Sequence, residues 1–226
     1  MNQDRLNQAK ERLLGEIAIE AAETALWTGR KVFSARVMAA IEAVPRHEFV
    51  APEDTLQAYA NRPLPIGRGQ TISQPYIVAV MTDFMDLEPA SRVLEIGTGC
   101  GYQTAVLAEL AAKVFSVEVI PELAEGAIRR LGRLGYENIA VKTGDGFKGW
   151  PGKGPYDAIM VTAAAAAAPE ALFEQMKPGA RIVIPIGRPY GRQTLYRGVM
   201  GDGGAANMEK TLPVAFVPLV RKRLRK

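Results

Sequence analysis

The sequence has little of what disulfide frameworks, metal sites and membrane spans require. It contains one cysteine, Cys100, and one histidine, His47, among 226 residues. A single cysteine excludes an internal disulfide, and no cluster of His and Cys is present to hold a metal. The most continuous apolar stretch, residues 158–168, is shorter than the roughly 18–20 residues of a membrane-spanning helix. We therefore expect a soluble, cytoplasmic protein with no metal and no membrane partner.

A strong excess of charge of one sign is also missing from most of the chain. There are 28 Lys and Arg residues against 24 Asp and Glu, and the last six residues, RKRLRK (221–226), are nearly all basic. The rest is close to neutral, so we expect no basic groove for nucleic acid and interpret the tail as a solvated end. Hydrophobic residues at 48% and charged residues at 23% are typical of a globular domain.

Short apolar runs alternate with helical patterns after residue 89. This alternation predicts an α/β fold with a mostly parallel central sheet, right-handed crossovers and helices on both faces. The runs are nearly continuous rather than alternating, which is typical of strands that are covered on both faces. The five runs are RVLEIG (92–97), KVFSVE (113–118), NIAVKTGD (138–145), YDAIMVTA (156–163) and RIVIPIG (181–187).

The regions before and after these runs have different sequence patterns. Residues 1–43 follow a helical pattern that Gly29 is expected to break, and residues 51–74 read as a loop rich in proline and glycine. Residues 169–176 are expected to form a helix and 177–180 a turn. Near the C-terminus, 194–200 and 214–220 are candidate strands on either side of an exposed loop, 201–210. We predict a single domain, 1–226, with an N-terminal helical and substrate-loop region (1–88), a cofactor-binding core (89–190) and C-terminal strands with a basic tail (191–226).

A glycine-rich loop follows the first apolar run and precedes a helical pattern. Gly97, Gly99 and Gly101 would let the backbone turn sharply and approach a ligand closely. In doubly wound sheets, ligands bind at this place, beyond the carboxyl ends of the strands. The spacing is G-x-G-x-G rather than the dinucleotide pattern G-x-G-x-x-G. On its own, the loop is also compatible with a packing turn that has no ligand.

Two carboxylates stand at the ends of the next two strands. Glu118 could accept hydrogen bonds from both hydroxyls of a ribose, and Asp145 could meet the exocyclic amine of an adenine. Taken alone, Glu118 is also compatible with a solvated strand end and Asp145 with a turn former. With the glycine loop, they indicate a ligand that contains adenosine. No G-x-x-x-x-G-K-[ST] loop for a nucleoside triphosphate is present, so S-adenosylmethionine, which has no phosphates, fits best.

These residues belong to a wider pattern that resembles the protein-L-isoaspartate (D-aspartate) O-methyltransferase family. The segment PLPIGRGQTISQP (63–75) carries most of the resemblance because it lies outside the cofactor-binding core. The other matching segments are VPRHEFV (44–50), VLEIGTGCGYQTAVLA (93–108), SVEVI (116–120), GDGFKGWP (144–151), YDAIMVTAAA (156–165) and FVPL (216–219).

The resemblance implies a Rossmann-like, S-adenosylmethionine-dependent methyltransferase. Such an enzyme transfers a methyl group to the α-carboxylate of L-isoaspartyl, and possibly D-aspartyl, residues of damaged proteins, and leaves S-adenosylhomocysteine. The ester then closes to a succinimide, which starts repair. The implied partners are isoaspartyl proteins and peptides, and a monomer is favoured. The expected cofactor-binding residues are Glu95, Gly97, Thr98, Gly99, Gly101, Glu118, Asp145, Gly146 and Gln74.

The resemblance also implies that Ser73 is the active-site serine, which would hold the acceptor carboxylate by a hydrogen bond. From the residues alone, Ser73 before Gln74 and Pro75 is typical of a helix N-cap. The expected substrate-binding residues are Thr71, Ile72, Ser73 and Val217. A carboxylate of pKa about 4 is ionised at pH 7, so no general base is needed.

Departures from the family pattern occur at Asn61, Cys100, Ala166 and Ala215. We interpret His47 as a surface or helix-end residue and Cys100 as a small packing residue. A methyltransferase that acts on another substrate, such as a small molecule or nucleic acid, and a non-catalytic protein that binds S-adenosylmethionine remain alternative interpretations.

Overall fold

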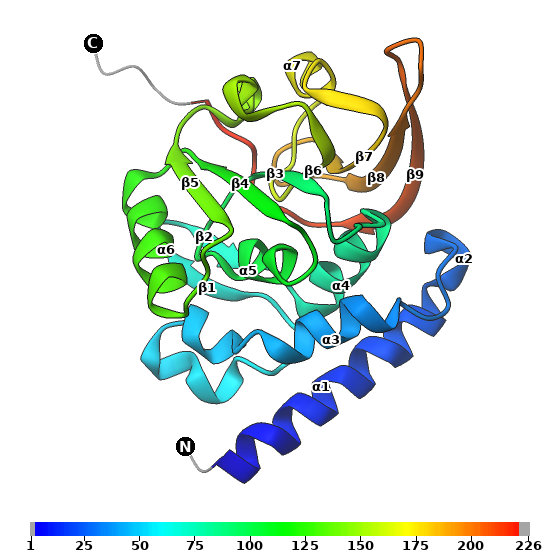
Figure 1. The fold of residues 1–226 in the computed structure, drawn as a ribbon. Helices are drawn as coiled ribbons and strands as arrows, with labels where there is room; N and C mark the ends of the chain where they lie inside the picture. Colours follow the sequence, from blue (N-terminus) through cyan, green and yellow to red (C-terminus); the bar gives the residue numbers. More distant parts are fainter. Residues whose placement is uncertain (1–2, 222–226) are drawn as a thin grey trace.

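A seven-stranded sheet organises residues 3–221, the part of the chain that this computed structural model describes (Figure 1). The strands lie in the order β5-β4-β3-β6-β7-β8-β9. The first five in this order run parallel, and β8 and β9 join antiparallel at one edge. The predicted fold class is confirmed. The bounds are β3 (Arg92–Ile96), β4 (Lys113–Glu118), β5 (Ile139–Thr143), β6 (Tyr156–Val161), β7 (Met176–Gly187), β8 (Gln193–Met200) and β9 (Ala206–Val214).

Alternate residues of the strands build a separate core on each face of the sheet. Val93 and Val114 face one core, whereas Leu94 and Phe115 face the other, because successive side chains point to opposite faces. The first core also takes residues from most of the longer helices, and the second takes Leu172 and Phe173 from α7 (Glu170–Phe173) and also Trp150. Both faces are therefore covered, as the apolar runs predicted.

The helices of the N-terminal third lie against other helices below the sheet (Figure 1). Helices α1 and α3 both pack on α4, and α3 also contacts α5. Gly29 has a left-handed φ of 67° and ends α2, so the predicted break is confirmed. The bounds are α1 (Gln3–Glu23), α2 (Ala25–Thr28), α3 (Ala35–Ala43), α4 (Pro75–Phe84), α5 (Tyr102–Ala108) and α6 (Pro121–Arg133), with 3-10 turns η1 (Arg46–Phe49), η2 (Pro52–Gln57), η3 (Gly146–Lys148) and η4 (Pro151–Lys153).

The stretch 51–74, expected as a loop, contains a β-hairpin. Strand β1 (Leu64–Gly67) pairs antiparallel with β2 (Gln70–Ile72). Arg68 and Gly69 form the turn with φ values of 54° and 71°, the conformation that a two-residue hairpin loop needs. The hairpin positions the residues that lead from Thr71 into α4.

Four expectations near the C-terminus are corrected. Helix α7 is one turn long, and the expected turn 177–180 lies inside β7. The last strand is β9, so the second half of the expected loop 201–210 is strand. Residues 214–220 mostly leave the sheet and run beside Ala164, whose N–H donates to the Val217 carbonyl at 2.8 Å. Pro218 lacks an N–H for a ladder, which suits an isolated bridge better than a strand.

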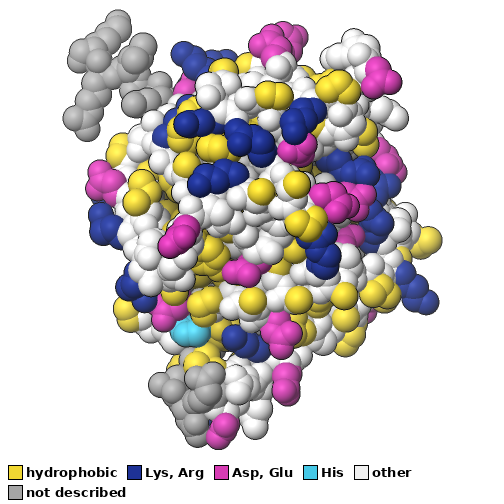
Figure 2. Space-filling model, viewed as in Figure 1, with side chains coloured by type: hydrophobic (Ala, Val, Ile, Leu, Met, Phe, Trp, Pro, Cys, Tyr) yellow, Lys and Arg dark blue, Asp and Glu magenta, His cyan; other side chains and the backbone are white. Residues whose placement is uncertain are grey.

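Among the described residues, no helix combines the length and apolar character that crossing a membrane would require. Residues 3–221 also contain no group of three or more His, Cys, Asp or Glu side chains placed to hold a metal ion. Carboxylates and basic side chains both occur on the face shown in Figure 2. Most of the basic tail, 222–226, lies outside the described residues.

Candidate active site

Two adjoining cavities lie at the carboxyl ends of the central strands. The first has about 800 Å³ of empty space, counting the part that is open to solvent. It is bounded by residues 97–100 of the loop after β3, the end of β4, the start of η3, the segment 70–73 (β2 and Ser73), and the C-terminal segment 217–220. This is the position that the parallel sheet predicts for a ligand.

The glycines of the loop are required by close packing and by backbone conformation. Gly97 has a φ of 98°, and a Cβ there would collide with the Thr162 hydroxyl, which donates to the Gly97 carbonyl at 2.6 Å. Gly101 has a φ of 93° and precedes α5, where a Cβ would lie 3.2 Å from Leu131. The loop thus presents backbone rather than side chains to the cavity.

Glu118 ends β4 and lines the first cavity. Its Oε2 accepts a hydrogen bond from the Gly99 N–H at 2.8 Å, and its Oε1 accepts one from the Ile120 N–H at 2.9 Å. An ionised carboxylate has about four acceptor positions, so about two remain for a ligand. The carboxylate is held rigidly and can accept from a ribose diol, as predicted for this position.

Glu95 lies beneath the loop and is not among the residues that line the cavity, which differs from the cofactor contact we expected. The side chain is fully buried, and its Oε2 accepts hydrogen bonds from Thr104 Oγ1 at 2.5 Å and Ser116 Oγ at 2.6 Å. Thr98 Oγ1 lies 2.5 Å from the same Ser116 hydroxyl. Burial raises the pKa of Glu95 to about 8. Glu95 therefore supports the loop from inside.

This buried carboxyl should make stability depend on pH. The folded chain keeps the Glu95 proton up to about pH 8, whereas an unfolded glutamate loses it near its usual pKa of 4.5. Between these values the unfolded state binds fewer protons, so stability falls as pH rises. We expect Glu95→Gln to gain about 2 kcal/mol relative to wild type between about pH 5.5 and pH 7, in urea unfolding. Parallel pH profiles for the two proteins would contradict the buried neutral carboxyl.

Ser73 lies where the first cavity meets a second one. The residue before helix α4 is Gln74, and it makes no side-chain cap, so the alternative of Ser73 as N-cap is not what the structure has. The Ser73 carbonyl accepts a hydrogen bond from Arg46 Nη2 at 2.8 Å. Within residues 3–221 the Ser73 hydroxyl has no hydrogen-bond partner, so it is available to a ligand.

The second cavity lies between α1, the hairpin segment and the C-terminal segment. It has about 1190 Å³ of empty space, again counting the part open to solvent. Four residues line both cavities: Thr71, Ser73, Thr162 and Val217. Ile72 is buried and lines the first cavity only. The structure therefore brings all four expected substrate-binding residues to this junction or next to it.

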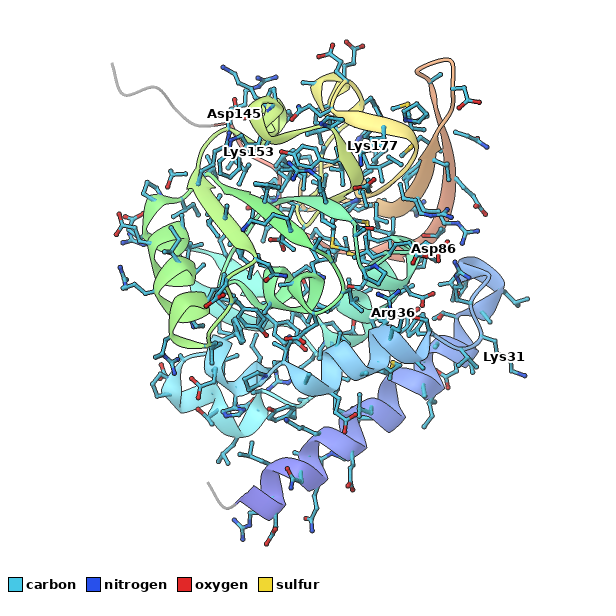
Figure 3. The ribbon with its side chains drawn as sticks, in the orientation of Figure 1. Lys31, Arg36, Asp86, Asp145, Lys153 and Lys177 are labelled. Carbon is cyan, nitrogen blue, oxygen red and sulfur yellow. The ribbon has the colours of Figure 1, made fainter. Side chains whose placement is uncertain are left out.

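Four expected cofactor contacts do not line the first cavity: Glu95, Gly101, Gln74 and Asp145. Gln74 lines the second cavity, and its Nε2 donates to the Glu20 carboxylate at 3.0 and 3.2 Å. Asp145 lies beside the last described residues (Figure 3), where its Oδ1 accepts from the Phe147 N–H at 3.0 Å and so begins η3. Its neighbour Gly146 lines the first cavity in its place. A Cβ at Gly146 would lie 2.5 Å from Ile96, so only glycine fits there.

Some residues that shape the site were not among the sequence predictions. Thr162 lines both cavities and packs on Gly97. Gln193 holds the C-terminal segment, because its Oε1 accepts from the Phe216 N–H at 2.6 Å and its Nε2 donates to the Phe216 carbonyl at 3.0 Å. No local motif marks Gln193. Thr162 lies near the end of the fourth apolar run and directly after β6, so its place at a strand end was the available signal.

The single histidine and cysteine are in the places that suit their expected roles. His47 lies in η1, outside the lining of both cavities, with its Nδ1 2.8 Å from the Tyr59 hydroxyl. Cys100 is buried in the glycine loop, and burial raises the pKa of its thiol.

Asn61, one of the departures from the family pattern, joins two elements, since it donates to Glu20 at 2.8 Å and accepts from the Tyr76 N–H at 3.0 Å.

Comparison with known proteins decides the family. A family model described as "Protein-L-isoaspartate(D-aspartate) O-methyltransferase" matches residues 23–224. The chain belongs to this family. Among its relatives is protein-L-isoaspartate O-methyltransferase 2 of Syntrophobacter fumaroxidans, which is 50% identical over 96% of this chain and 87% of the relative. Protein-L-isoaspartate O-methyltransferase 1 of Cupriavidus necator is 51% identical over 97% of this chain and 85% of the relative. The family predicted from the sequence is confirmed.

Solved structures support the same fold. A structure entitled protein-L-isoaspartate O-methyltransferase superposes with a TM-score of 0.81 and 29% identity, over 94% of this chain and 66% of that chain. A second, from Plasmodium falciparum, is described as a complex with S-adenosyl-L-homocysteine. It has a TM-score of 0.76 and 22% identity, over 94% of this chain and 98% of that chain. At that identity, the second structure supports the fold alone.

Proposed function

We propose that this member of the family is a protein-L-isoaspartate O-methyltransferase with S-adenosylmethionine in the first cavity and the isoaspartyl residue in the second. The observation that carries the proposal is the junction between the cavities, where Ser73 and three other residues face both. Donor and acceptor would meet there. Methyl transfer needs such contact, because in-line approach to about 3–3.5 Å supplies much of the rate enhancement.

The residues that line the first cavity support binding of S-adenosylmethionine there. Gly97 and Gly99 line the cavity with backbone, and Glu118 offers acceptor positions to a ribose. Gly146 and the segment 217–220 bound the cavity on its remaining side. When bound, S-adenosylmethionine supplies an electrophilic methyl group on a positively charged sulfur. In this assignment Glu95 supports the loop from inside, Thr98 lines the cavity, and Asp145 begins η3.

The second cavity would hold the acceptor in the correct orientation. The acceptor carboxylate is ionised at neutral pH and needs no base, which agrees with the absence of His47 from the cavity lining. The Ser73 hydroxyl can donate a hydrogen bond to one carboxylate oxygen and leave the other to attack. Thr71 and Val217 flank this position. The chain's task is therefore to align two reactants of opposite charge and to exclude water from between them.

The decisive experiment is transfer of radiolabelled methyl groups from S-adenosylmethionine to a pair of peptides. The two peptides differ only in having isoaspartate or aspartate at one position. Base-labile label on the isoaspartyl peptide alone is the expected result. Label on neither, with S-adenosylmethionine binding intact in calorimetry, would favour a methyltransferase of another substrate or a non-catalytic binding protein. The cytoplasmic location, the monomeric state and the lack of a nucleic-acid partner stay predictions from the sequence.

Ser73→Ala should lower kcat about 30-fold, since a hydrogen bond to a charged group contributes about 2 kcal/mol. The Kd of S-adenosylmethionine should change less than about twofold, because the hydroxyl is assigned to the acceptor. Ser34→Ala is the matched control. It removes the side chain that caps α3, outside both cavities, and should leave kcat unchanged. Full activity in Ser73→Ala would remove the hydroxyl from the mechanism.

A further inference from the structure

The second cavity continues beyond the acceptor position toward the N-terminal helices. Glu20, Thr24 and Trp27 line it, and they also line a third, shallower cavity along α1. The third cavity adds Glu16, Ile19, Glu23 and Asn61 to its walls. The second and third cavities therefore adjoin at these three residues, and together they extend from the Ser73 junction past Glu20 to Trp27. We call these two adjoining cavities the channel. A peptide with its isoaspartate at Ser73 has room for a flanking side chain in this channel.

The Glu20 carboxylate in this channel has amide partners but no cation. It accepts from Asn61 Nδ2 at 2.8 Å and from Gln74 Nε2, and within residues 3–221 no Lys, Arg or His forms an ion pair with it. The lining of the second and third cavities contains no basic residue. Burial raises the pKa of Glu20, and the nearby Glu23 charge adds to the rise. Its negative charge is therefore hydrogen-bonded but not neutralised.

Trp27 supplies the aromatic wall of the same channel. Its side chain is 57% exposed although it lines both cavities, so one part of the indole remains available to a ligand. An indole face attracts a Lys or Arg side chain by cation–π contact, and it also covers the aliphatic stem. A carboxylate and an indole in one channel are complementary to a long cationic side chain.

The distance from the acceptor position limits which substrate residue can reach Glu20. Gln74 directly follows Ser73, and its side-chain amide touches the Glu20 carboxylate. Consecutive Cα atoms lie about 3.8 Å apart, so a substrate residue one or two positions from the isoaspartate can span this gap with a Lys or Arg side chain.

We propose that Glu20 and Trp27 form a specificity subsite for a Lys or Arg that stands one or two residues from the isoaspartate. The proposal rests on the proposed function and adds a substrate preference to it: isoaspartyl sites with a basic flank are methylated in preference to sites with an acidic flank. A lysine or arginine in the channel neutralises Glu20, whereas a glutamate there faces Glu20 and Glu23 together.

The test uses isoaspartyl peptides that carry Lys, norleucine or Glu at one of the two positions on either side of the isoaspartate. Norleucine matches the lysine stem without its charge. We expect kcat/KM of the wild-type enzyme at about 50 mM salt to be about fivefold higher for Lys than for norleucine at one position, and lower again for Glu, as for a partly exposed ion pair. The preference should shrink at about 0.5 M salt, which screens the charges.

Glu20→Gln keeps the shape and one acceptor oxygen but removes the charge. The Lys-to-norleucine ratio of kcat/KM should fall to about one in this variant. Trp27→Leu keeps an apolar wall without the indole face, and the same ratio should fall about twofold. Glu11→Gln is the matched control, because it makes the same charge change on an exposed part of α1 that lines neither cavity. Its ratio should equal that of wild type.

Equal kcat/KM for Lys, norleucine and Glu at all four positions would overturn the subsite but leave the proposed function standing. A lysine preference that persists in Glu20→Gln would overturn the assignment to Glu20. Methyl transfer to none of the isoaspartyl peptides would overturn the proposed function and the subsite with it. Each comparison is a ratio of kcat/KM values for two peptides with the same variant. A lower amount of folded enzyme changes both values equally and therefore leaves this ratio unchanged.

Discussion

Arg46→Ala should lower the free energy of unfolding by about 4 kcal/mol. Arg46 is fully buried in η1, and its guanidinium donates to three backbone carbonyls: Ala58 at 2.8 Å, Arg62 at 3.4 Å and Ser73 at 2.8 Å. Alanine would leave these acceptors without partners and would open a cavity of most of an arginine side chain. Urea unfolding monitored by circular dichroism measures the loss.

The guanidinium also joins the two halves of the site. Its carbon lies 4.8 Å from the centre of the Tyr102 ring, and Tyr102 begins α5 directly after the glycine loop. Arg46 thus contacts both the segment that carries Ser73 and the helix that follows the cofactor loop. Burial lowers the pKa of Arg46 from its usual range. The backbone carbonyls and the Tyr102 ring stabilise the buried positive charge.

Two further variants separate charge from geometry in this prediction. Arg46→Lys keeps a cation but offers fewer donors in a less extended arrangement, so it should cost about half as much as alanine. Arg129→Ala removes an exposed arginine of α6 with a weak ion pair to Glu125 and should change stability by less than about 0.5 kcal/mol. A similar loss in the Arg46 and Arg129 variants would show that the buried hydrogen bonds do not matter.

The parallel part of the fold could be predicted because its strands have a local signal. Runs such as RVLEIG and YDAIMVTA are apolar on both faces, and glycine or helical patterns separate them. The hairpin 64–72 was missed because its strands are short, although Arg68-Gly69 is a recognisable two-residue turn. Strand β9 was missed because it is exposed at an edge, and its register depends on pairing with β8 rather than on its own apolar pattern.

The site could be predicted as far as it follows strand ends. Glu118 lies where its position after the second run indicated, because a strand end fixes both the place and the direction of the side chain. Gln74, expected at the cofactor, lines the second cavity with Ser73, because its side chain is held by Glu20 of α1, a long-range contact that the sequence does not show. The hydrogen bonds between the Gln193 side chain and the Phe216 backbone could not be predicted either, because they join residues that only the tertiary structure brings together.

Glu118→Ala should weaken S-adenosylmethionine binding about 100-fold, measured as Kd by calorimetry. The variant lacks the carboxylate, so the ribose hydroxyls would lose their proposed acceptor. Hydrogen bonds to a charged acceptor contribute about 1.5–3 kcal/mol. The Gly99 N–H would also lose its acceptor, so the glycine loop would be held less firmly. Glu118→Gln keeps one acceptor oxygen, and we expect an intermediate weakening of about tenfold.

The neighbouring Glu122 provides the matched control for this prediction. It lies in the first turn of α6, is largely exposed, and pairs with Arg68 at 3.1 Å, outside the first cavity. Glu122→Ala should therefore bind S-adenosylmethionine as wild type does, although it loses the same charge. Equal Kd values for Glu118→Ala and wild type would contradict the ribose assignment. Of these two glutamates, Glu118 is the one that two backbone N–H groups hold at the cavity wall. Equal weakening in both variants would therefore mean that overall negative charge attracts the ligand, and not the carboxylate held at that position.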